Sequence, residues 1–143
     1  MKRILLFFLL ALVLVSGLVG CTRTVQIDDL SRTSYIELRA HSSNGHKDDV
    51  DYLISDYEAV DSLCLTLQSL TLEKVRITEP LGLAYSLVFY DHAHREISSL
   101  LVVYGNYVHY NGDLYKITGD CDLKNYLDSI VSGLLPYEKG DTK

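Results

Sequence analysis

The stretch Leu83–Thr118, LAYSLVFYDHAHREISSLLVVYGNYVHYNGDLYKIT, decides the fold of this 143-residue chain. Its two long apolar runs, 83–90 and 97–104, carry hydrophobic side chains at both alternating positions. This pattern is typical of strands in the middle of a sheet, covered on both faces or partly by a partner. Shorter segments follow in quick succession: turns at 91–95, 105–106 and 111–113, and strands at 107–110 and 114–117. Because short turns join antiparallel neighbours, this stretch predicts an antiparallel meander.

Further strands are predicted before this meander. Residues 34–41 alternate between apolar and polar side chains, which indicates a half-buried strand. Asn44-Gly45 favours a tight hairpin turn, and 50–54 is predicted to be a short returning strand. Residues 73–78 also alternate, and the proline and glycine of 79–82 end that strand.

Two amphipathic helices are expected. The first covers 56–70, where Ser55 and Glu58 fit a capping box at the helix start. The second follows Gly119, with Asp120 or Asp122 as its cap, and is ended by Gly133 and Pro136. Its apolar side chains recur at helical spacing: Leu123, Tyr126, Leu127, Ile130, Val131 and Leu134.

These elements predict a single small α+β domain over residues 34–135. We expect a twisted antiparallel sheet of about five to seven strands in a meander, with two amphipathic helices packed on one face. Residues 21–33 are polar and are predicted to be a flexible tether, and 136–143 a polar C-terminal tail.

The first 21 residues have the pattern of a secretory signal peptide. Lys2 and Arg3 precede an apolar run, and small residues follow it. The ending LVGC at 18–21 resembles the lipobox of bacterial lipoproteins. That resemblance implies cleavage of residues 1–20 and attachment of a diacylglyceryl group and fatty acyl chains such as palmitate to Cys21, which anchors the chain in a membrane. The alternative is an uncleaved N-terminal helix in which Cys21 is incidental.

The charge balance restricts the function classes. The chain has 13 Lys or Arg and 19 Asp or Glu residues, and without Lys2 and Arg3 the eleven bases face nineteen acids, a formal net charge of −8. Such a balance argues against binding of nucleic acid and against adhesion to anionic lipid headgroups. We therefore expect the lipid to hold the domain at the cell membrane, outside the cytoplasm, or at the outer membrane in an organism with two membranes.

Cys64 and Cys121 are candidates for a disulfide, because the compartment outside the cytoplasm allows such bonds. The alternative is two unpaired thiols, with Cys64 packed as a small hydrophobic residue. The sequence leaves both open, because spacing alone does not show whether the two Cβ atoms face each other.

No phosphate-binding loop, zinc helix or nucleophile elbow occurs in the chain. Asp91, His92 and His94 are weak candidates for a metal site, because two imidazoles on one face of a strand and a nearby carboxylate are metal-ligating types. In a turn they would instead point into water, and we expect no cofactor. The acidic residues of 48–51 are predicted to be a solvated turn, and His41 is expected to be a surface residue.

Eleven tyrosines and no tryptophan make an unusual aromatic set. Tyrosines on an exposed sheet face can stack on sugars or anchor a protein, since they combine an apolar ring with a polar tip. The alternative is that alternation directs half of them inward. The candidates for such a binding surface fall in one hairpin region: Tyr104, Tyr107, Tyr110 and Tyr115.

The stretch YVHYNGDLYKI at 107–117, a hairpin before a final helix, resembles small uncharacterised extracytoplasmic domains of Gram-positive bacteria. The resemblance supports the fold prediction and implies no activity. The leading hypothesis is a non-enzymatic binding or accessory module at the outer face of the membrane, with a membrane-proximal protein or an envelope glycan as partner. The alternative is a small envelope hydrolase, with or without a metal, that uses Asp91, His92 and His94.

Overall fold

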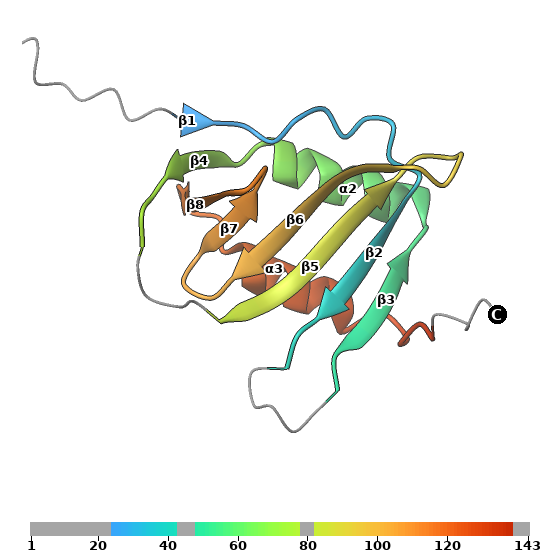
Figure 1. The fold of residues 1–143 in the computed structure, drawn as a ribbon. Coiled ribbons are helices and arrows are strands. Elements are labelled where there is room, and N and C mark those ends of the chain that lie inside the picture. Colours follow the sequence, from blue (N-terminus) through green and yellow to red (C-terminus); the bar gives the residue numbers. More distant parts are fainter. Residues whose placement is uncertain (1–23, 43–47, 78–81, 139–143) are drawn as a thin grey trace, which may run out of the picture.

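The computed structural model describes residues 24–42, 48–77 and 82–138, which form eight strands and two helices (Figure 1). The elements in chain order are β1 Thr24–Val25, β2 Tyr35–Ala40, β3 Val50–Ile54, α2 Tyr57–Gln68, β4 Thr71–Lys74, β5 Leu83–Tyr90, β6 Glu96–Val103, β7 Tyr107–Tyr110, β8 Asp113–Thr118 and α3 Leu123–Val131. The predicted α+β class is confirmed.

The eight strands form one sheet in the order β1-β4-β8-β7-β6-β5-β2-β3, and every neighbouring pair is antiparallel. The antiparallel sheet is therefore confirmed, with one strand more than the predicted five to seven. The predicted meander is limited to β5, β6, β7 and β8, because β4 pairs with β8 and β2 pairs with β5. The additional strand is β1, which pairs with β4 through Thr24 and Val25.

The strand β5 lies in the middle of the sheet between β2 and β6, as its apolar sequence predicts. Its two faces differ in burial. Leu87 and Phe89 are fully buried, whereas Ser86 and Val88, on the other face, are only half-buried. Within the part of the chain that the structure describes, β5 is thus covered on one face, and the predicted cover on both faces is not present. We call the other face the open face.

The buried core joins sheet and helix side chains. The buried cluster that contains Phe89 of β5 also contains Leu63 and Leu67 of α2 and Leu123 and Leu127 of α3. Figure 1 shows both helices behind the sheet.

Both helix starts use an aspartate. At α2 the carboxylate of Asp56 accepts a hydrogen bond from Ala59 N at 3.0 Å. The predicted capping box of Ser55 and Glu58 is therefore wrong by one position, because Tyr57 is the first helical residue and Ala59 the third. Asp122 caps α3, one of the two predicted caps, by accepting from Asn125 N at 3.1 Å.

The strand predicted at 73–78 begins and ends earlier, at Thr71–Lys74. Leu72 explains the shift, because it is fully buried and is the partner of Ile117 on β8. The predicted turns at Asn44-Gly45 and around Pro80 lie outside the described residues.

Residues 24–33 belong to the domain, so the predicted flexible tether over 21–33 is wrong for this part. Ile27 and Leu30 are buried, with 6% and 1% of their surface exposed, and both belong to the core cluster. The Tyr110 hydroxyl donates to Asp28 Oδ2 at 2.7 Å and accepts from Asp28 N at 3.0 Å. The apolar side chains in this polar segment fill the core, and backbone pairing through β1 holds its first residues.

Candidate functional site

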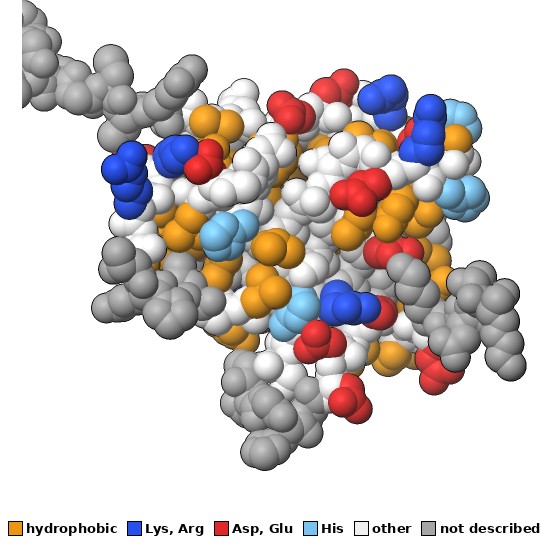
Figure 2. Space-filling view, in the orientation of Figure 1, with side chains coloured by type: hydrophobic (Ala, Val, Ile, Leu, Met, Phe, Trp, Pro, Cys, Tyr) orange, Lys and Arg blue, Asp and Glu red, His pale blue; other side chains and the backbone are white. Residues whose placement is uncertain are grey.

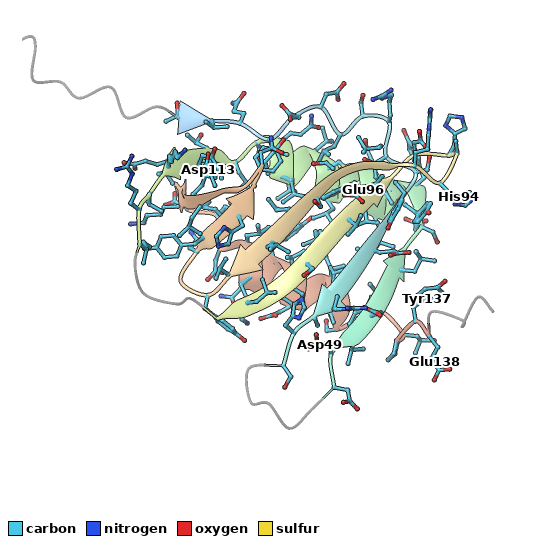
Figure 3. The ribbon with its side chains drawn as sticks, in the orientation of Figure 1. Asp49, His94, Glu96, Asp113, Tyr137 and Glu138 are labelled. Atoms are coloured by element: carbon cyan, nitrogen blue, oxygen red, sulfur yellow. The ribbon has the colours of Figure 1, made fainter. Side chains whose placement is uncertain are left out.

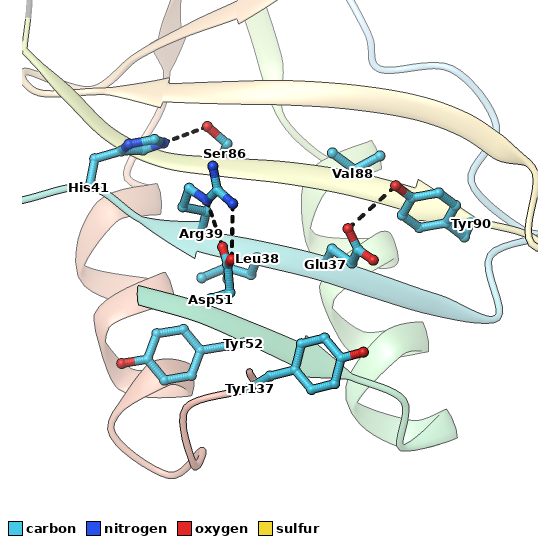
Figure 4. A pocket seen from close by; sticks show the side chains of 10 residues that line it. All are labelled: Glu37, Leu38, Arg39, His41, Asp51, Tyr52, Ser86, Val88, Tyr90 and Tyr137. Carbon is cyan, nitrogen blue, oxygen red and sulfur yellow. Dashed lines mark hydrogen bonds and ion pairs between the residues drawn. The ribbon is translucent and has the colours of Figure 1, made fainter. Parts of the chain in front are cut away.

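A groove of about 280 Å³ lies over the open face, at the side of the sheet formed by β5, β2 and β3 (Figure 4). Figure 2 shows the open face in the orientation of Figure 1, with basic, acidic and histidine side chains interspersed among hydrophobic ones. The groove, which we call the open-face groove, is lined by Glu37, Leu38, Arg39, His41, Asp51, Tyr52, Ser86, Val88, Tyr90 and Tyr137.

An ion pair forms part of the groove wall. Arg39 and Asp51 are directly opposite on β2 and β3, and Arg39 donates from Nε to Oδ1 at 2.6 Å and from Nη2 to Oδ2 at 2.9 Å. The hydrogen bonds that Arg39 donates to the Asp51 carboxylate raise the pKa of Arg39 above its ordinary value, so that the guanidinium stays charged. Both side chains are partly exposed, so the pair contributes at most about 1 kcal/mol to stability. Its main effect is to hold the guanidinium in one orientation.

His41 connects two other polar side chains. Its Nδ1 lies 2.8 Å from Asp49 Oδ2, and its Nε2 lies 2.6 Å from Ser86 Oγ. Asp49 Oδ1 also accepts from Ser42 N at 3.2 Å. Because a carboxylate only accepts, the network assigns the imidazole proton to Nδ1 and leaves Nε2 to accept from the serine hydroxyl.

Two tyrosines flank these polar groups. Tyr90 stacks on Tyr35 with ring centroids 4.9 Å apart, and its hydroxyl donates to Glu37 Oε2 at 3.4 Å. Tyr137 follows α3 and lies beside β3, where its backbone N donates to Asp51 O at 2.7 Å (Figure 3). The groove therefore combines aromatic rings with charged hydrogen-bonding groups contributed by β2, β3, β5 and the segment after α3.

Asp91, His92 and His94 lie in the turn between β5 and β6, and none of the three lines the groove. Asp91 is buried and accepts from Ala93 N at 2.8 Å, from Arg95 N at 3.0 Å and from Arg95 Nε at 2.9 Å. His94 Nδ1 shares a hydrogen bond with the Tyr35 hydroxyl at 3.1 Å. Among residues 24–42, 48–77 and 82–138, no three His, Cys, Asp or Glu side chains are placed to hold a metal ion. Asp91 thus stabilises the turn.

We expect replacement of Asp91 by asparagine to lower stability in a pH-dependent way. Hydrogen bonds from the Arg95 backbone, the Arg95 side chain and Ala93 lower the pKa of Asp91 to about 2, below its ordinary 3.8. The stabilisation is therefore complete above pH 3.8 and is lost as pH falls toward 2. Thermal melts followed by circular dichroism should show a lower melting temperature for Asp91→Asn at pH 7 and a much smaller difference at pH 2.

The control for this comparison is Asp61→Asn, which changes an exposed carboxylate on α2. We expect a smaller change between the two pH values for this variant. Equal melting temperatures of the wild type and Asp91→Asn at pH 7 would contradict the role of Asp91 in the turn.

The four candidate tyrosines do not share one exposed surface, so that prediction is wrong. Tyr110 and Tyr115 are buried, with 3% and 6% of their surface exposed, because alternation along β7 and β8 places them on the core side with Val108. Tyr104 is half-buried, with the Lys124 ammonium 5.7 Å from its ring centroid, and Tyr107 is also half-buried.

Cys64 and Cys121 are free thiols in the structure, so the candidate disulfide is not formed. Cys64 is buried on α2, and Cys121 is half-buried before α3, where its carbonyl accepts from Asn106 Nδ2 at 3.1 Å. Burial raises the pKa of both thiols, which keeps them protonated. Cys21 and the lipobox lie outside the described residues.

Comparison of the chain with models of protein families, with curated proteins and with solved structures finds no match. Among the helices that the structure describes, none has the length and apolar character needed to cross a membrane.

The groove was not predicted from the sequence. The acidic residues of 48–51 were expected to be a solvated turn and His41 a surface residue, whereas Asp51 pairs with Arg39 and Asp49 with His41. A signal was present, because hairpin pairing in which Ala40 faces Val50 places these residues opposite each other. Ser86 carried no such signal, since its contact with β2 joins residues far apart in the chain.

Proposed function

We propose that this chain is a lipid-anchored lipoprotein outside the cytoplasm whose domain is a binding module with its ligand site in the open-face groove. The groove is the observation that carries the proposal, since it gathers an ion pair, a histidine and three tyrosines into one concave site. Asp91 accepts hydrogen bonds from the turn and from Arg95, which speaks against the alternative of a metal-dependent hydrolase at Asp91, His92 and His94.

The groove's chemistry favours an envelope glycan over a protein partner. Its volume of about 280 Å³ suits a small ligand, whereas a stable protein interface buries about 800 Å² on each partner. The ion pair of Arg39 with Asp51 offers both donors and acceptors to sugar hydroxyls. The rings of Tyr90 and Tyr137 offer apolar surface to the C–H faces of a pyranose.

The anchor is supported by the lipobox ending in Cys21 and by the position of β1. Only Thr22 and Arg23 separate Cys21 from Thr24, so a lipidated Cys21 would hold β1 within about 10 Å of the lipid attachment point. We also take both helices to pack on the face of the sheet opposite the groove, which leaves the groove accessible to material of the envelope.

Binding is tested with the full chain purified in detergent and an N-acetylglucosamine tetrasaccharide as the probe. We expect saturable binding by calorimetry. Arg39→Gln should weaken it by about tenfold or more, because a charged hydrogen bond to the sugar contributes about 1.5–3 kcal/mol. The matched control is Lys74→Gln, which breaks the Lys74–Asp113 ion pair of 2.6 Å on β4 and β8 and should leave affinity unchanged.

The absence of saturable sugar binding would contradict the glycan proposal. Recovery of a reproducible protein after crosslinking in membranes, lost in Arg39→Gln and retained in Lys74→Gln, would favour a protein partner instead. The anchor is tested separately by mass spectrometry of the chain from bacterial membranes, which should find Cys21 as a diacylglyceryl N-terminus. A chain that retains Met1 would contradict the anchor.

A further inference from the structure

We propose that Ser86 is a nucleophile toward small acyl esters and that His41, oriented by Asp49, is its general base. This inference goes beyond ligand binding. It rests on the open-face groove and not on the lipid anchor.

The geometry matches what nucleophilic catalysis by serine needs. The base lies within hydrogen-bond distance of the hydroxyl, at 2.6 Å between His41 Nε2 and Ser86 Oγ, and the orienting carboxylate of Asp49 lies 2.8 Å from Nδ1. The carboxylate holds the imidazole in the tautomer whose Nε2 can take the serine proton. Ser42 N, which donates to Asp49 Oδ1 at 3.2 Å, holds that carboxylate in turn.

Three segments of the sheet bring the residues together. Ser86 lies on β5 with its side chain on the open face, His41 follows the last residue of β2, and Asp49 precedes β3. His41 N donates to Ala84 O at 2.9 Å, which fixes the backbone of His41 against β5. Figure 4 shows the imidazole of His41 and the hydroxyl of Ser86 pointing toward each other.

Arg39 supplies a charge beside the nucleophile. It is the direct cross-strand partner of Ser86, so the two side chains leave the sheet on the same face as neighbours. A guanidinium has five N–H donors, and Asp51 binds it through Nε and Nη2. A cation held in one orientation beside the serine stabilises the negative charge that develops on a carbonyl oxygen under attack.

The reaction balances with water as the second reactant. Ser86 Oγ attacks the carbonyl carbon while its proton moves to His41 Nε2, and the C–O bond of the ester breaks as the leaving alkoxide takes that proton. Water then attacks the acyl-serine, gives a proton to His41 and releases the carboxylic acid as the proton returns to Ser86 Oγ. No oxidation or reduction occurs.

The site favours a small acyl ester as the substrate class. A groove of about 280 Å³ holds a short acyl group and part of its alcohol, and an ester carbonyl is more electrophilic than that of an amide. An acetyl ester of a polyhydroxy compound fits both the nucleophile and the polar lining.

The test uses the full chain purified in detergent, with a fluorophosphonate probe and p-nitrophenyl acetate. We expect the probe to form an adduct that peptide mass spectrometry locates at Ser86. Ester hydrolysis should fall to the background rate in Ser86→Ala, because no acyl-serine can form. It should fall about 10²–10⁴-fold in His41→Ala, the usual contribution of a general base. The matched control is Ser99→Ala, an exposed serine on β6, which should keep both the adduct and the rate.

Asp49 acts through His41 and is therefore a positioning residue. Asp49→Asn should lower kcat with little change in KM, and Asp49→Glu should restore part of kcat, a pattern that general loosening of the fold does not produce. Melting temperatures of all variants show whether each is folded.

Equal hydrolysis by Ser86→Ala and the wild type, or an adduct elsewhere in the chain, would overturn the proposal. Its failure is distinguishable from failure of the binding proposal, because neither probe contains a sugar. A chain that binds the tetrasaccharide and is not labelled keeps the binding function alone, whereas one that is labelled and binds no sugar keeps the esterase alone.

Discussion

Leu30→Ala is expected to lower the free energy of unfolding by about 2–5 kcal/mol, the usual cost of truncating a fully buried leucine. Leu30 has 1% of its surface exposed and lies in the core cluster, although its segment is polar in sequence. The loss combines the transfer free energy of the removed methyl groups with the cavity they leave. Urea denaturation followed by circular dichroism measures it as a lower midpoint at an unchanged slope.

The control for this prediction is Leu65→Ala on α2, which removes the same atoms from a side chain that is 60% exposed. We expect a change within about 0.5 kcal/mol there. If the two variants were equally stable, residues 24–33 would not be part of the folded domain. The sequence-based prediction of a flexible tether would then be correct for this segment.

Phe89→Ala should cost about 3–5 kcal/mol, because it removes a large, fully buried ring from the central strand β5. Ile36 on β2 and Ser98 on β6 are its cross-strand partners, and few atoms can move to fill the cavity between paired strands. The same urea denaturation measures the loss of stability. A variant that is already unfolded without urea would indicate a loss larger than this.

Val88→Ala, one residue away on the opposite face of β5, is the matched control. Val88 is half-buried and lines the open-face groove, so we expect about 1 kcal/mol or less. A cost at Val88 similar to that at Phe89 would mean that the open face is covered in solution. In that case the two-sided apolar pattern of β5 would reflect burial on both faces, as its sequence predicts.

Most of the strands could be predicted, because the alternation and turn residues that indicate them are local in the sequence. Strands β3, β5 and β7 have the predicted bounds, and β6 begins and ends one residue earlier than predicted. The turn between β7 and β8 was also predicted from its residue types. Asn111 and Gly112 have the positive φ angles of 49° and 82° that such a hairpin needs. The strand at Thr71–Lys74 was misplaced because Leu72, its buried residue, stands beside the end of the preceding helix.

The N-terminal segment shows where composition misleads. Residues 24–33 are mostly polar, and a count of charges predicts a solvated tether. Two apolar side chains, Ile27 and Leu30, are enough to dock the segment, because the core offers them a dry site and Tyr110 offers Asp28 a buried hydroxyl. No pattern within residues 24–33 indicates that the core has room for these two side chains.

The sequence by itself determined the order and type of nearly all elements and the α+β class, since periodicity and turns act over a few residues. It also determined the antiparallel pairing of β2 with β3 and of the consecutive strands from β5 to β8. The tertiary structure alone decided which side chains meet. Pairing of β2 with β5 sets Arg39 against Ser86 and brings His41 to its hydroxyl, across more than forty residues of chain. That pairing follows from burying the apolar face of the whole sheet together, a free energy that no single segment carries.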